Sequence, residues 1–104
     1  MQTTTDQSGG VLKLAGELSI YEAERLRQTL AEALETASNL TLDLSEVEKC
    51  DASAIQILYS ARITADQSSK FIEIREASRP VLETCEALGL PVEALSSPRL
   101  SASE

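Results

Sequence analysis

The stretch LTLDLSEVEKCDASAI, residues 40–55, decides the fold of this chain. Leucines alternate with polar residues over 40–44, and this period of two predicts a strand. The polar residues 45–49 then predict a turn. Asp51 and Ser53 stand where a helix would begin, since their side-chain oxygens can accept hydrogen bonds from the free amides of its first turn. Apolar residues recur at helical spacing after Ser53, so the stretch predicts a strand followed by a helix.

A second strand and helix are predicted on the N-terminal side of this unit. A Gly-Gly pair at 9–10 separates a polar segment from an apolar alternation and favours a first hairpin. Ser19 and Glu22 have the spacing of a capping box, in which each side chain bonds the backbone amide of the other residue. We therefore expect a helix from about Ile20.

A further strand and helix are predicted on the C-terminal side of residues 40–55. Residues 71–75 alternate and predict another strand. Ser78 ahead of Pro80 predicts a third helix that ends near Gly89, because proline is tolerated in a first helical turn and glycine is favoured just after a last one. A short last strand is predicted at 92–95. The apolar stripe of the third helix comprises Val81, Leu82, Cys85 and Leu88.

Strands that alternate with helices predict an α/β fold. They require crossover connections, so the sheet should be largely parallel, with four or five strands and an antiparallel edge at the first hairpin. The length of 104 residues and the 42% hydrophobic content suit one core. We expect a single domain over residues 1–95 and a disordered tail over 96–104, which is small and polar.

Charge and hydropathy argue against several classes of binding partner. The formal net charge of -8 repels nucleic acid and anionic lipid surfaces. No apolar run approaches the ~18 residues of a membrane-spanning helix, and residues 1–10 lack the pattern of a signal peptide. Nucleic-acid and membrane partners are therefore disfavoured, and we expect a cytoplasmic protein.

The residues needed for common enzyme chemistry are missing. The chain has no histidine to act as the base of a serine nucleophile or to complete a zinc site with Cys50 and Cys85. Its glycines form no phosphate-binding loop. The acidic side chains near 43–51 are expected to be solvated or to cap a helix. We therefore predict no catalytic residue, no metal and no cofactor, and interpret both cysteines as small buried side chains.

Ser53 has two interpretations, and its local chemistry does not choose between them. It can cap the helix that follows, or it can accept a phosphate near the positive end of that helix. A ridge at four-residue steps, Ile55, Tyr59 and Ile63, lies beside the main apolar stripe. This ridge packs on a neighbouring helix or presents an apolar contact surface, and spacing favours packing.

Four short motifs together resemble a known family. They are GEL at 16–18, LDLS at 42–45, DAS at 51–53 and ALGL at 87–90, in family order over nearly the whole chain. The chain thereby resembles the STAS family, which includes anti-anti-sigma factors and the regulatory domains of sulfate transporters. The resemblance implies a small mixed sheet with helices mainly on one face. Ala52 and Ala54 replace a serine and a glycine of the commonest family form, Asp-Ser-Ser-Gly-Leu.

The resemblance also implies a function. In the bacterial regulators of this family a partner kinase phosphorylates a serine at the start of the second helix, and Ser53 matches that serine. The chain would then be a non-enzymatic signalling adaptor, an anti-sigma factor antagonist that binds a kinase of the anti-sigma type until phosphorylation ends the binding. The expected contact residues are Asp51, Ala52, Ser53, Ala54, Ile55, Gln56 and Tyr59.

Two alternatives stay open. A constitutive interaction subunit of a lipid transporter or of a chemosensory complex would use the same helix face without phosphorylation. A receiver-like domain would instead accept phosphate on Asp43, near the end of the predicted central strand. The acidic pair and the late lysine that such a site requires are missing from the sequence, which argues against this second alternative.

Overall fold

The computed structural model describes residues 1–6 and 10–98. One four-stranded sheet with strand order β1-β2-β3-β4 forms the centre of the molecule. β1 pairs antiparallel with β2, whereas β2 with β3 and β3 with β4 pair in parallel. The elements are β1 (Gln2–Thr5), β2 (Val11–Leu18), the 3-10 turn η1 (Ile20–Glu22), α1 (Ala23–Thr36), β3 (Asn39–Cys50), α2 (Ala52–Gln67), β4 (Phe71–Arg75), α3 (Arg79–Ala87) and the 3-10 turn η2 (Val92–Leu95).

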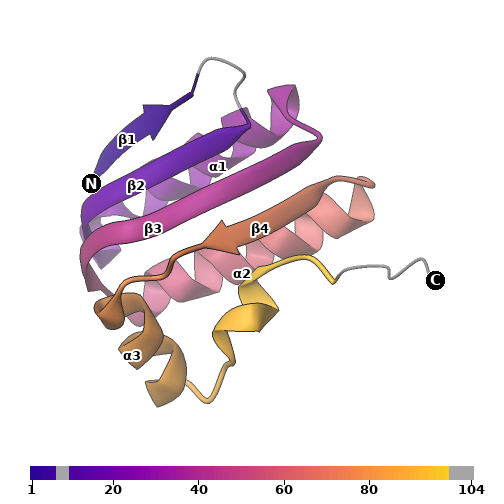
Figure 1. The fold of residues 1–104 in the computed structure, drawn as a ribbon. Helices are drawn as coiled ribbons and strands as arrows, with labels where there is room; N and C mark the ends of the chain where they lie inside the picture. The colour runs from indigo at the N-terminus through magenta and orange to yellow at the C-terminus, as the bar shows by residue number, and fades with distance from the viewer. Residues whose placement is uncertain (7–9, 99–104) are drawn as a thin grey trace.

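This architecture confirms the predicted α/β fold with a mixed, largely parallel sheet. α1 and α2 lie together behind the sheet in Figure 1, whereas α3 lies at one end of it. No helix of residues 1–6 and 10–98 covers the opposite face of the sheet. The first predicted hairpin forms, although Gly9 of its expected turn lies outside the described residues.

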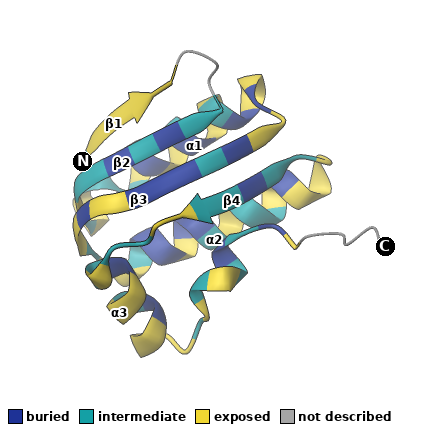
Figure 2. Cartoon of the chain, in the orientation of Figure 1, coloured by how far each residue is buried: buried dark blue, intermediate teal, exposed yellow. Residues whose placement is uncertain are grey.

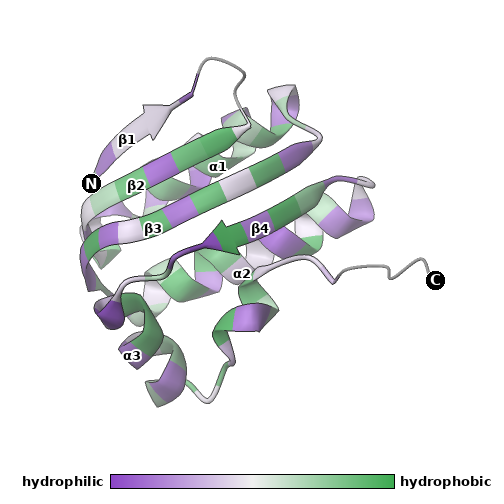
Figure 3. Ribbon diagram, in the orientation of Figure 1, coloured by the Kyte–Doolittle hydropathy of each residue, from purple (hydrophilic) through white to green (hydrophobic). Residues whose placement is uncertain are grey.

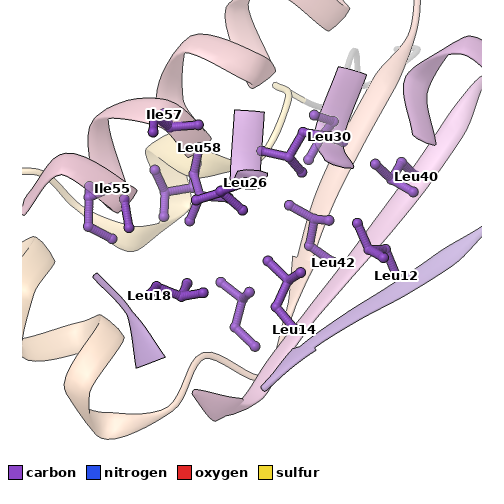
Figure 4. Close-up of a cluster of buried hydrophobic side chains, with 14 of the residues drawn as sticks. Leu12, Leu14, Leu18, Leu26, Leu30, Leu40, Leu42, Ile55, Ile57 and Leu58 are labelled. Atoms are coloured by element: carbon purple, nitrogen blue, oxygen red, sulfur yellow. The ribbon is translucent and has the colours of Figure 1, made fainter. Parts of the chain in front are cut away.

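The core fills the space between the sheet and these two helices. Apolar and hydrophilic residues alternate along β2, β3 and β4 (Figure 3), so each strand turns its leucines and isoleucines toward the helices. Burial is greatest along β2 and β3, whereas β1 is exposed (Figure 2). The close-up in Figure 4 shows this cluster, whose fully buried members include Leu12, Leu14, Leu26, Leu30, Leu42 and Leu58.

The central strand β3 is longer than its sequence pattern predicts. The expected turn at 45–49 is wrong, because these residues continue the strand to Cys50. Val47 is buried and pairs with Gly16 of β2, whose backbone has a φ of 84°. Register shifts on both sides of this pair break the strict alternation. Asp43 therefore lies in the middle of β3 and not near its end.

The predicted capping box at the start of α1 is also wrong. Neither Ser19 nor Glu22 makes a side-chain cap, and residues 20–22 form the separate turn η1 before α1 starts at Ala23. The Glu22 carboxylate instead lies 3.3 Å from the ammonium group of Met1. Glu22 thus pairs with the Met1 ammonium group and not, as the capping-box spacing suggests, with the backbone amide of Ser19.

Two further expectations fail in the C-terminal third. Leu82 and Leu88 are 44% and 43% exposed, so the buried side of α3 contains only Val81 and Cys85 of the predicted stripe. The predicted last strand is the 3-10 turn η2.

The segment after η2 attaches to the free edge of β4. The backbone amide of Ser97 donates to the carbonyl of Ile72 at 2.7 Å, and the amides of Ile72 and Ile74 donate to the hydroxyls of Ser97 and Ser96. These two serines belong to the segment we expected to be a disordered tail, and residues 99–104 of that segment lie outside the described residues. Over the described ranges, no helix has the length and apolar character needed to cross a bilayer.

Candidate functional site

Two loops meet at one edge of the sheet, where β2 leads into η1 and β3 leads into α2. Because β2 and β3 are parallel, α1 and α2 both begin at this edge. Asp51 joins the two loops: its carboxylate accepts a hydrogen bond from the amide of Ile20 at 2.8 Å, and its own amide donates to the carbonyl of Leu18 at 2.9 Å. Asp51 occupies the N-cap position of α2, but its side chain makes no cap bond to that helix.

Large apolar side chains are exposed beside this junction. Ile20 is 62% exposed and Tyr21 is 94% exposed. Sequence reasoning missed both residues, because it placed Ile20 inside a regular amphipathic helix. The signal that could have found them is the pair of bulky apolar residues directly after Ser19, before the regular stripe of α1 begins at Ala23.

Ser53 lies in the first turn of α2 and faces α1. Its hydroxyl oxygen is buried and has no hydrogen-bond partner among the described residues, so its interpretation as a helix cap is wrong. It lines a groove of about 430 Å³ between the two helices. Leu30, Leu34 and Ile57 contribute large apolar side chains to the groove, and Arg27 of α1 is the one charged residue among the described residues that line it.

The other predicted contact residues divide into three groups. Ala52 and Gln56 are exposed next to Ser53. Ala54 and Ile55 are only 1% and 0% exposed, so they belong to the core and are removed from the predicted contact surface. Tyr59 is half-buried.

Tyr59 does not lie beside Ser53. Arg62 stacks over the Tyr59 ring at 5.5 Å and donates to the carbonyl of Ala94 in η2. Six helical residues at about 100° each place Tyr59 well around α2 from Ser53. The ring thus lies on the η2 side of the helix, whereas Ser53 lies on the α1 side.

Burial keeps the two cysteine thiols protonated. Burial, followed by the nearby Cys85 and Asp51, raises the pKa of the Cys50 thiol to about 12, and burial also raises that of Cys85. A thiol is a poor nucleophile under such conditions. Within the described ranges, no group of three or more acidic or cysteine side chains could hold a metal ion.

Both carboxylate oxygens of Asp43 have hydrogen-bond partners. The hydroxyl and amide of Ser45 donate to its Oδ1, and the guanidinium of Arg75 lies 3.2 Å from its Oδ2. In order of size, the bonds from Ser45 and then the contact with Arg75 lower its pKa from 3.8 to about 2. Both carboxylate oxygens are engaged and the residue is mid-strand, which does not support the receiver-like alternative.

Comparisons with known proteins agree with this geometry. A family model described as "Mlab, STAS domain" matches residues 1–95. A solved structure entitled "Structure of the Anti-Sigma Factor Antagonist SpoIIAA in its Unphosphorylated Form" is similar with a TM-score of 0.69. The identity is 17%, over 88% of this chain and 83% of the other, so the likeness concerns the fold. No curated protein sequence matches the chain. Because the family model spans nearly all of the sequence, the chain belongs to the STAS domain family.

Proposed function

We propose that this domain is a non-enzymatic adaptor that docks a protein partner, and that phosphorylation of Ser53 ends the docking. The docking surface, called here the η1–α2 surface, comprises Ile20, Tyr21, Asp51, Ala52 and Gln56. The observation that carries the proposal is the exposure of Ile20 and Tyr21 next to the start of α2. Asp51 holds this apolar pair in place through its bond to the amide of Ile20.

Charge suggests the chemistry of the partner. Exposed carboxylates of Glu17, Glu24 and Asp51 flank the apolar pair in sequence or in space, and the chain as a whole carries -8. Apolar contacts at the centre with charged contacts at the rim are typical of protein interfaces. A partner with an apolar pocket and a basic rim would be complementary to this surface. A serine kinase of the anti-sigma type is such a candidate, and it would act in the cytoplasm.

Ser53 is suitable as the switch for two reasons. It lies between the exposed residues Ala52 and Gln56, so a phosphate there would add about two negative charges at the η1–α2 surface. The solved structure of similar fold is described as the unphosphorylated form of an anti-sigma factor antagonist. The buried hydroxyl must rotate outward to reach a kinase. This rotation breaks no hydrogen bond to the described residues and lets the hydroxyl bond to water, so it is favoured.

Intact-mass analysis tests the switch. The protein is isolated from its native cells with phosphatase inhibitors, together with Ser53→Ala and, as a matched control in the same helix, Ser60→Ala. We expect a phosphate-sized mass increase in the wild type and in Ser60→Ala that is absent from Ser53→Ala. An unshifted mass across growth and stress conditions, or a shift that persists in Ser53→Ala, would refute phosphorylation at Ser53.

A constitutive interaction subunit is the second candidate function. The burial of the Ser53 hydroxyl favours it, since an unphosphorylated serine needs no access. Partner recovery that is equal for wild type and Ser53→Asp, but lost in Ile20→Ser with Tyr21→Ser, would support this candidate. No observation favours the chemosensory association, which stays a prediction.

A further inference from the structure

The groove between α1 and α2 has one positively charged residue in its described lining. Arg27 is the only charged residue among the described residues that line it, and Ser53 lines the same groove from the opposite helix. The other polar groups of the lining are the side chains of Gln56, Ser60 and Thr64, none of which is charged. An anionic group inside this groove would therefore find one cation and several neutral hydrogen-bond donors.

Ser53 and Arg27 line the same groove from facing helices, so a phosphate on Ser53 would share the groove with that cation. Its oxygen is buried and finds no hydrogen-bond partner in the described part of the chain, which is uncommon because a buried hydroxyl loses its hydrogen bonds to water. The groove provides about 430 Å³ of open space beside it, which is ample for a phosphoryl group. A phosphate on Ser53 could thus turn toward α1 and not only toward solvent.

Arg27 is able to reach this position. α1 and α2 begin at the same edge of the sheet, and packed helices lie about 8–10 Å apart. Ala23, in the first turn of α1, also lines the groove, and Arg27 follows it by one helical turn. The long arginine side chain can span that separation and bind two phosphate oxygens at once.

The present partner of Arg27 is easily displaced. Its Nη1 lies 2.9 Å from Oε1 of Glu24, three residues earlier on the same helix. Both side chains are more than half exposed, and exposed pairs of this kind are weak. A phosphate dianion competes well against such a single carboxylate.

We propose that Arg27 is the phosphate-binding residue of the Ser53 switch and that the resulting ion pair bridges α1 and α2. Its physiological use rests on the proposed function. In the modification, the Ser53 oxygen attacks the γ-phosphorus of a nucleoside triphosphate held by the kinase. The new O–P bond replaces the bond to the β–γ bridging oxygen, a nucleoside diphosphate leaves, and the hydroxyl proton passes to a base of the kinase.

Phosphorus NMR tests the ion pair directly. Phosphoserine is incorporated at position 53 during translation in the full chain, in Arg27→Gln and in Arg25→Gln. Arg25 is the matched control, because it carries the same charge on the same helix but binds the Met1 carbonyl and Glu22 and does not line the groove. The measured quantity is the second pKa of the phosphate, which is about 6 for an isolated phosphoserine.

A phosphate paired with arginine retains its dianion to lower pH. We expect the phosphate pKa to be about one unit lower in the otherwise unchanged protein than in Arg27→Gln, and Arg25→Gln to match the otherwise unchanged protein. Arg27→Lys, which keeps the charge but lacks the planar fork, should give an intermediate value. Equal pKa values with and without Arg27, or an equal increase in Arg25→Gln, would overturn the proposal.

The failure of this proposal can be distinguished from the failure of the proposed function. The phosphate is installed without a kinase, so the NMR result does not depend on whether cells phosphorylate Ser53. An unshifted intact mass from native cells refutes the switch and leaves the ion pair to be judged by its own titration. A switch that operates with a phosphate pKa independent of Arg27 refutes only the ion pair.

Discussion

Replacing Asp51 with alanine should release η1 from α2. The substitution removes a 2.8 Å hydrogen bond from the amide of Ile20 to a carboxylate, which joins two loops 31 residues apart. Hydrogen bonds to charged groups contribute about 1.5–3 kcal/mol. Asp51 is exposed, so water replaces part of the bond, and we expect the free energy of unfolding to fall by about 1–1.5 kcal/mol. For a domain of this size the melting temperature should fall by roughly 4–8 °C.

Amide hydrogen exchange distinguishes this bond from an ordinary helix cap. The geometry predicts that exchange accelerates most at Ile20 in Asp51→Ala, because its amide loses its acceptor. Asp51→Asn keeps an oxygen but loses the charge and should give about half of the effect. Glu48→Ala removes a nearby carboxylate of the same charge and serves as the control. If Ile20 keeps its protection while only the first amides of α2 exchange faster, Asp51 acts as an ordinary helix cap and does not hold η1.

Three other predictions concern Asp43, Ser53 and Ile55. The pKa of Asp43 is lowered from 3.8 to about 2, so its ionised form stabilises the fold by up to about 2 kcal/mol above pH 4, and this stabilisation should vanish as the pH falls to 2. Chemical unfolding of wild type and Asp43→Asn across that range checks this, and a difference independent of pH would contradict it. Ser53→Ala removes an unpartnered buried hydroxyl and should raise the free energy of unfolding by about 1 kcal/mol. A decrease in urea unfolding experiments would show that the hydroxyl is a cap. Ile55→Ala should lower the free energy of unfolding by about 3 kcal/mol because Ile55 is 0% exposed, and an unchanged melting temperature would return Ile55 to the contact surface.

Local patterns were sufficient for the order of the strands and α-helices up to α3. The alternation of Leu40, Leu42 and Leu44 predicts β3. All three leucines are buried in the core, as that alternation requires. Pro80 and Gly89 mark the ends of α3, and Gly89 indeed has a φ of 70°. Such signals depend on the backbone of neighbouring residues, which a sequence displays directly.

The features of the fold that the sequence did not predict depend on interactions between distant residues. The capping box at Ser19 and Glu22 fails because the Met1 ammonium lies beside Glu22 in the folded chain. β3 continues past its leucines because Gly16 and the register shifts allow β2 to follow it. Neither effect has a signature within a short window of sequence.

In the candidate site, too, local sequence identified single residues but not the contacts between distant ones. The resemblance located Ser53 and Asp51, but no spacing rule connects Asp51 with the amide of Ile20. Whether Ile55 faces the core or a partner depends on how α2 rotates against the sheet, and the core occupies that side. The groove that unites Ser53 with Arg27 exists only after α1 and α2 pack together.

Photo-crosslinking in native cells tests the η1–α2 surface and its switch together. p-Benzoylphenylalanine is placed at Tyr21 or, as a control, at the exposed Leu82 of α3. We expect one discrete crosslinked protein from position 21 that persists in Ser53→Ala, is strongly reduced in Ser53→Asp, and is missing from position 82. A product that forms equally from both positions, or that is unchanged in Ser53→Asp, would contradict it.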